Sequence, residues 1–177
     1  MRRMALPLVG ALAAVAAALA ALVGRKRPSC PERYRARVVS IAAAELGTSE
    51  ADNPDRITEY IVDAVGNDPR GRGGRLEWCG IFALWALHQA GLGRGVRWPI
   101  GATFLGKLPS TSDPQPGDIA YFTHNQHHAI VERVNDDRTV DLINGNGTGA
   151  KVTRSTNVPL EKARSYESIQ PWIDEVC

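Results

Sequence analysis

The spacing of apolar residues changes once along this chain of 177 residues, near Pro99, and this change limits the possible folds. Before it, apolar residues recur every three or four positions, which is the period of a helix with one buried face. After it, short apolar runs alternate with clusters of Asn, Asp and Gly, which is typical of strands joined by tight turns. Helices followed by an antiparallel sheet predict an α+β fold.

The expected elements have clear stop signals. Three helices are predicted: Glu32 to Leu46 before Gly47, a second after Asn53-Pro54 that ends at Gly66, and Cys79 to Ala90 before Gly91. The segment from Arg70 to Gly74 is expected to be a loop. Four strands are predicted, over Ile119–Thr123, His127–Val134, Thr139–Asn144 and Lys151–Arg154.

The N-terminal segment has the composition of a membrane helix. Residues 5–23 carry no charge and follow Arg2 and Arg3. As a helix they would span about 28 Å, close to the thickness of the hydrocarbon core of a bilayer. We expect residues 1–24 to be a signal anchor or a signal peptide, residues 25–37 a basic linker and the start of the first helix, and residues 38–177 the globular domain. The protein is then membrane-anchored or exported, and basic residues at both ends leave the side of the membrane open.

Charge and cysteine content exclude several classes of protein. Lys and Arg total 21 against 19 Asp and Glu, and without Arg2 and Arg3 the two signs are equal. A globular part without net charge is not expected to bind nucleic acid. Three cysteines are too few for a disulfide scaffold and lack the paired spacing of a zinc ribbon.

Cys79 is the first candidate for chemistry because it opens an apolar helix. The positive end of the helix dipole lowers the pKa of a thiol placed there, and the thiolate is the nucleophilic form. Unpaired backbone N–H groups at the same end can bind a developing oxyanion. Gly80 leaves room for a substrate or another chain to approach closely. The alternative is that Cys79 is a small buried residue of a core helix.

Two neighbouring histidines follow a predicted turn. Alternate strand residues share a face, so His127 lies with Ala129 and His128 lies on the opposite face. The small Ala129 leaves room for the helix that carries Cys79, so His127 is the predicted general base and His128 the second choice. A zinc site formed by these histidines and Cys79 is not favoured, because adjacent strand residues point away from each other. No metal or cofactor is expected.

A catalytic imidazole needs a partner that fixes its orientation. Asn144 or Asn146, in an Asn-Gly-Asn-Gly run after a predicted strand, is the candidate for this role. An amide orients the ring but stabilises imidazolium less than a carboxylate does. The same run is also what an ordinary tight turn contains.

Four blocks together resemble a known family: Trp-Cys-Gly-x-Phe, Pro-Gly-Asp-Ile, His-His-Ala-Ile-Val and Ile-Asn-Gly-Asn. Their order and spacing, over about Val38 to Thr153, are similar to the CHAP family (cysteine, histidine-dependent amidohydrolase/peptidase), which belongs to the papain-like, NlpC-related enzymes. The resemblance implies a papain-like domain with Cys79 as nucleophile and His127 as base. Asn144 stands where the family often has Glu, and Asn146 matches its Asn.

The resemblance also implies a substrate and a mechanism. CHAP domains cleave amide bonds of bacterial peptidoglycan, either the muramyl–alanine amide or bonds of the peptide stems and cross-bridges. The reaction proceeds through a thioester on the cysteine. Glu77, Trp78 and His128 are the predicted substrate-binding residues. The departure at Asn144 leaves a second hypothesis open, a catalytically weak or silent binding module, and an antibacterial toxin or lysin would use the same chemistry.

Cys30 and Cys177 flank the predicted domain. In an oxidising compartment these two residues could bridge the ends of the domain as an intramolecular disulfide. The alternative is two unrelated thiols, one beside the linker and one at the end of the chain.

Overall fold

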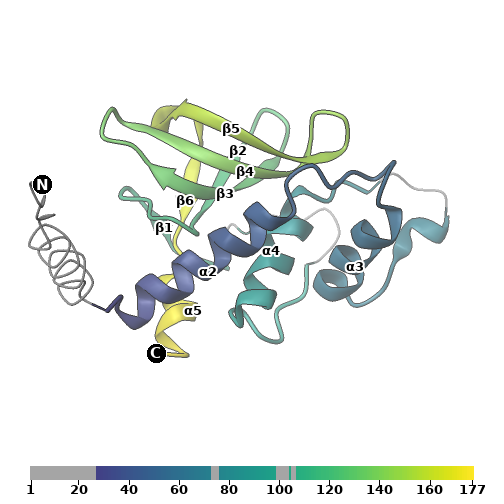
Figure 1. Ribbon diagram of the computed structural model, residues 1–177, viewed down its shortest axis with the longest axis horizontal. Coiled ribbons are helices and arrows are strands. Elements are labelled where there is room, and N and C mark those ends of the chain that lie inside the picture. The colour runs from purple at the N-terminus through teal and green to yellow at the C-terminus, as the bar shows by residue number, and fades with distance from the viewer. Residues whose placement is uncertain (1–26, 73–75, 99–103, 105–106) are drawn as a thin grey trace, which may run out of the picture.

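A computed structural model describes residues 27–72, 76–98, 104 and 107–177 (Figure 1). The helices are α2 (Cys30–Ala44), α3 (Pro54–Val65), α4 (Cys79–Ala90) and α5 (Gln170–Asp174), with short 3-10 turns η1 (Pro69–Arg72) and η2 (Leu160–Lys162). The strands are β1 (Ser110–Thr111), β2 (Ile119–Phe122), β3 (His127–Val134), β4 (Thr139–Gly147), β5 (Lys151–Pro159) and β6 (Ser165–Glu167).

The α+β class predicted from the sequence is confirmed. The sheet order is β1-β6-β2-β3-β4-β5, and every paired neighbour is antiparallel. The three predicted helices end close to the expected glycines, because Gly66 and Gly91 adopt the left-handed conformation that closes a helix. Helix α2 begins at Cys30, two residues before the predicted start, because Ser29 and Glu32 form a capping box there.

Helix α4 is the centre of the fold. It lies beneath the sheet between α2 and α3, packed on β3 and β4 (Figure 1). Every residue from Cys79 to Leu87 is buried, as expected for a helix that is apolar all round. A Cβ atom on Gly80 would lie 2.3 Å from the Trp98 ring. The space at Gly80, expected to admit a substrate or another chain, is therefore filled by a side chain of the same chain.

Both faces of the sheet carry buried apolar residues. The face toward the helices contributes Ile119, Ile130 and Ile143 to the main core around α4. A second, smaller cluster lies on the other face and is formed by Ala120, Ala129, Val131, Val140, Leu142 and Tyr166. Strand β3 therefore separates two apolar clusters, and adjacent residues of β3 belong to different ones.

The Pro-Gly-Asp block has a structural role. Asp118 is 1% exposed, and its Oδ1 accepts hydrogen bonds from the Arg35 guanidinium at 2.8 Å and from the Ile169 backbone at 3.1 Å. Its Oδ2 accepts a third bond, from the Gln115 backbone at 2.8 Å. One buried carboxylate thus joins helix α2, the turn before β2 and the segment that leads into α5.

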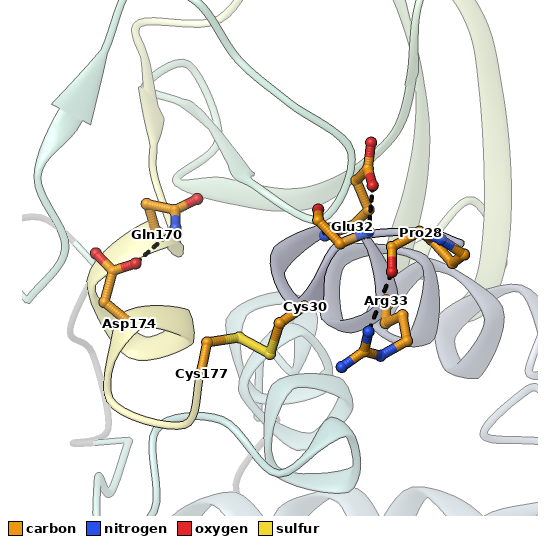
Figure 2. Close-up of a disulfide and its surroundings, with 8 residues drawn as sticks. Pro28, Cys30, Glu32, Arg33, Gln170, Asp174 and Cys177 are labelled. Carbon is orange, nitrogen blue, oxygen red and sulfur yellow. Dashed lines mark hydrogen bonds between the residues drawn. A yellow bond between two sulfur atoms is a disulfide. The ribbon is translucent and has the colours of Figure 1, made fainter. Parts of the chain in front are cut away.

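A disulfide joins the two ends of the described chain. Cys30, the first residue of α2, is bonded to Cys177, which follows α5 (Figure 2), and their Cα atoms are 5.9 Å apart. Of the two alternatives left open by the sequence, the structure shows the disulfide. Helix α5 also docks through its own core residues, Trp172 and Ile173.

Removal of this disulfide is expected to lower the stability of the domain strongly. The bond closes a loop with a sequence separation of 147 residues, for which the chain-entropy treatment gives up to about 5 kcal/mol. The double variant Cys30→Ser/Cys177→Ser should therefore melt well below the parent in calorimetry, and dithiothreitol should lower the melting temperature of the parent alone. Equal melting temperatures for parent and variant would contradict a stabilising bond.

In the described part of the chain, none of the helices is both long enough and apolar enough to cross a bilayer. The anchor or signal segment predicted over residues 1–24, with its membrane-spanning part at residues 5–23, lies outside the described residues.

Candidate active site

Cys79 is placed where the sequence predicted it, as the first residue of α4. Its side chain is 7% exposed, and its sulfur faces the start of strand β3. The Sγ atom lies 3.9 Å from the backbone oxygen of Gln126 and 4.0 Å from Nδ1 of His128. The thiol therefore touches the residues on both sides of His127, and no hydrogen bond between Cys79 and His127 is found within the described residues.

The surroundings of Cys79 favour the neutral thiol. Burial raises the pKa of Cys79, and the nearby Glu77 carboxylate raises it further. Backbone N–H groups of His128, Gly80 and Cys79 itself act in the opposite direction, because they stabilise the thiolate. The amides of Cys79 and Gly80 lie in the first turn of α4, where backbone donors have no partner within the helix, so they can also stabilise an oxyanion.

His128 is a core residue. Its ring is 1% exposed and lies among Trp98, Phe104 and Tyr121, with ring centroids 5.2, 5.7 and 4.9 Å away. Its Nε2 has no hydrogen-bond partner among the described residues. Burial, together with the charge of His127, lowers the pKa of His128 to about 4. His128 is thus neutral at physiological pH, and its burial contradicts the expectation that it contacts substrate.

His127 is the partly exposed histidine and has an orienting partner. Its Nε2 is 3.0 Å from Oδ1 of Asn144 on β4. The pair borders a surface pocket of about 360 Å³, whose walls include Phe122, Leu142 and Val158. The imidazole is therefore accessible from the pocket, and its hydrogen bond to Asn144 on the neighbouring strand β4 fixes the orientation of the ring.

The partners of Asn144 fix the tautomer of His127. The Nδ2 group of Asn144 donates to the backbone oxygen of Thr153 at 3.3 Å and to the hydroxyl of Ser155 at 3.1 Å. Since a carbonyl oxygen only accepts, Nδ2 must face Thr153 and Oδ1 must face His127. Nε2 of His127 then carries the proton, and Nδ1 holds the free electron pair that a general base needs.

Burial also determines the protonation of His127. It lowers the pKa of the imidazole, whereas the hydrogen bond to Asn144 and the Glu77 carboxylate act to raise it. The pKa remains below its ordinary value, so the resting ring is neutral at physiological pH.

The sequence argument for the face of β3 is wrong. Ala129 was expected to face the helix that carries Cys79, but it packs with Leu142 and Tyr166 in the cluster on the opposite face. Ile130, and with it His128, faces the helix layer. The error arose because both faces of β3 are buried, so a small residue does not mark the face that meets a helix.

Asn146, Glu77 and Trp78 have separate roles. The Nδ2 group of Asn146 donates to Oε2 of Glu77 at 2.5 Å, so Asn144 and not Asn146 holds His127. Glu77 is exposed. Trp78 is 0% exposed and packs against the rings of Tyr60 and Phe82. Of the three predicted substrate-binding residues, only Glu77 is accessible, and Trp78 and His128 belong to the core.

The described residues contain no group of three or more His, Cys, Asp or Glu side chains arranged to hold a metal ion. Cys79 and His128 lie close together, but the second nitrogen of His128 is enclosed in the core. The groups that the described structure brings together here are a thiol, imidazole rings and backbone amides.

The comparison with protein families agrees with this arrangement. Residues 71–146 match the family model of the CHAP domain. The segment that carries the candidate site is therefore similar to a CHAP domain. The matched segment includes Cys79, both histidines and both asparagines, and CHAP domains are generally hydrolases that act on peptidoglycan. No curated protein and no solved structure matches the chain.

Proposed function

We propose that this CHAP-like domain is a thiol-dependent amidase or endopeptidase that cleaves amide bonds of bacterial peptidoglycan. Cys79 is the nucleophile and His127 the general base. The observation that carries the proposal is the position of Cys79 at the first turn of α4, where its thiol contacts Gln126 and His128, the residues that flank His127 at the start of β3. The hydrogen bond to Asn144 leaves Nδ1 of His127 free to act as a base. Catalytic contacts are often loose in a free enzyme and tighten when substrate binds.

The proposed reaction is acyl transfer in two steps. For this step the His127 ring turns to the side of β3 that meets α4, and its Nδ1 takes the proton of the Cys79 thiol while sulfur attacks the amide carbon. The backbone amides of Cys79 and Gly80 stabilise the oxyanion, and His127 returns the proton to the leaving amine. Water, deprotonated by His127, then hydrolyses the thioester and releases a carboxylic acid and the free thiol.

The resting protonation states predict a broad pH profile. A neutral thiol beside a neutral imidazole is the reactive form, because the base must be free of its proton. The acid limb of kcat/KM should lie below 6.5, since burial lowers the pKa of His127. The basic limb should lie above 9.0, since burial raises the pKa of Cys79. Fragment release measured across this range checks both limbs, and an acid limb above pH 7 would contradict the assignment.

A second assignment of the base is supported by one distance. His128 Nδ1 is 4.0 Å from the sulfur. Its enclosure and its pKa of about 4 make it a poor proton carrier. His127, which has an orienting partner and access to a pocket, is therefore preferred.

A silent binding module is the alternative function. It is supported by the amide at position 144, which stabilises an imidazolium less than a carboxylate does, and by the lack of a bond between Cys79 and His127 in the described structure. A module of this kind would retain wall binding without cleaving an amide.

The proposed location is the cell envelope. Peptidoglycan lies outside the cytoplasm, and disulfides such as Cys30–Cys177 form and persist in oxidising compartments. The bond therefore supports an exported domain, whichever way the N-terminal segment is processed.

Digestion of purified peptidoglycan followed by mass spectrometry tests the proposal. An amidase releases peptides with a new amino terminus on the first alanine, whereas an endopeptidase creates new ends within stems or cross-bridges. Either product supports a hydrolase and identifies the bond. Binding to the wall without new ends would establish the silent module instead.

A further inference from the structure

Glu77 has no assigned role beyond the expectation that it lines the substrate cleft. It lies two residues before Cys79, and the fully buried Trp78 fixes the backbone between them. The carbonyl of Trp78 accepts the Phe82 N–H at 2.8 Å, which ties this segment to the first turn of α4. Glu77 is therefore attached to the same rigid element as the nucleophile.

The far end of the Glu77 side chain is held by strand β4. Asn146 adopts φ 51°, and the β4–β5 register shifts between Asn144 and Gly147. Such irregularities redirect side chains near functional sites, and Asn tolerates the left-handed conformation better than most residues do. Here the irregular turn presents the Asn146 amide to the Glu77 carboxylate. The carboxylate is thus placed between the start of α4 and the end of β4.

We propose, on the basis of the function above, that Glu77 is a positioning residue whose carboxylate, held by Asn146, supplies beside His127 the negative charge that Asn144 lacks. Asn144 orients the ring as a neutral amide. During attack on the amide, His127 becomes a cation, and a fixed anion nearby stabilises that cation. The orienting and charge-stabilising tasks are then divided between two residues on different elements.

The electrostatics agree with this geometry. The Glu77 carboxylate raises the pKa of both His127 and Cys79, so its field reaches both members of the proposed pair. Among the described residues, His124 lines the same pocket as His127, and His128 is neutral at physiological pH. Glu77 is therefore the anion that favours proton transfer to His127 while keeping the resting sulfur protonated.

The variant Glu77→Gln isolates the charge. Glutamine keeps the length and an acceptor oxygen for Asn146, so the fold and the contact should persist. We expect kcat to fall about tenfold with KM nearly unchanged, and the acid limb of kcat/KM to move to lower pH. Glu175→Gln, at the C-terminal end of α5, removes one charge elsewhere and should change neither quantity.

Nuclear magnetic resonance titration of His127 gives a readout that does not depend on turnover. Its signal is assigned with His127→Ala, and Glu77→Gln should titrate at lower pH than the parent, with Glu77→Asp closer to the parent. If the titration shifts in this way but the parent does not hydrolyse the wall, the proposed function is refuted and the electrostatic interaction between Glu77 and His127 is retained. An unmoved titration, or a rise in KM alone, would refute the role of Glu77 whether or not the parent is active.

Discussion

Replacement of Cys79 by alanine is expected to lower the rate of wall-fragment release by at least about 10³-fold, because the reaction depends on a covalent thioester. The other two cysteines are joined in a disulfide and offer no free thiol. The measurement is the rate at which soluble fragments with new amino termini appear from purified peptidoglycan.

The fold of this variant should be retained. Cys79 is small, and alanine leaves only a small cavity at the start of α4, so the melting temperature should change by a few degrees. Wall binding should also persist, since the contacts around the pocket are intact. A folded Cys79→Ala protein that releases fragments within tenfold of the parent would contradict covalent catalysis.

Replacement of His127 by alanine is expected to lower kcat/KM by about 10²–10⁴-fold, the usual contribution of a general acid–base residue. His127 is partly exposed, so its loss should affect stability little. The matched variant is His128→Ala, because the two residues are adjacent and share the chemistry of the ring. Turnover and melting temperature are measured for both proteins.

The two variants should show opposite patterns. His128→Ala removes a ring packed among Trp98, Phe104 and Tyr121, so its main effect should be a lower melting temperature, with turnover of the folded protein reduced less than tenfold. If only His128→Ala loses turnover, the general base is His128, whose Nδ1 is 4.0 Å from the Cys79 sulfur.

Most of the fold could be predicted because its boundaries depend on local chemistry. Helices α3 and α4 end at Gly66 and Gly91, which take a conformation that few other residues adopt. Strands β2 and β3 match the predicted runs to within one residue. Strands β1 and β6 and helix α5 were not predicted, because elements of two, three and five residues are too short to show a period.

The composition of the site was predictable, but its pairing was not. Cys79, His127 and Asn144 stand out by residue type and by spacing between the four motif blocks. The choice between Asn144 and Asn146 depends on a register shift after Asn144 and on the position of Glu77. Neither feature has a local signal, because both depend on how β4 meets β5 and the start of α4.

The proximity of His128 to the sulfur was missed for a related reason. Strand alternation correctly separates His127 from His128, but the sequence does not show which face meets α4 when both faces are apolar. Ala129 and Ile130 are buried in different clusters. The larger Ile130, and not the smaller Ala129, turned out to mark the helix-facing side.

The rate at which iodoacetamide alkylates Cys79 tests most directly whether His127 activates this thiol. Cys79 is the free thiol of a chain with three cysteines, so the label reports on one atom. At neutral pH, His127→Ala should lower the second-order rate at least about tenfold, because imidazole then no longer accepts the proton as the carbon–sulfur bond forms. An unchanged rate in folded His127→Ala would contradict the account.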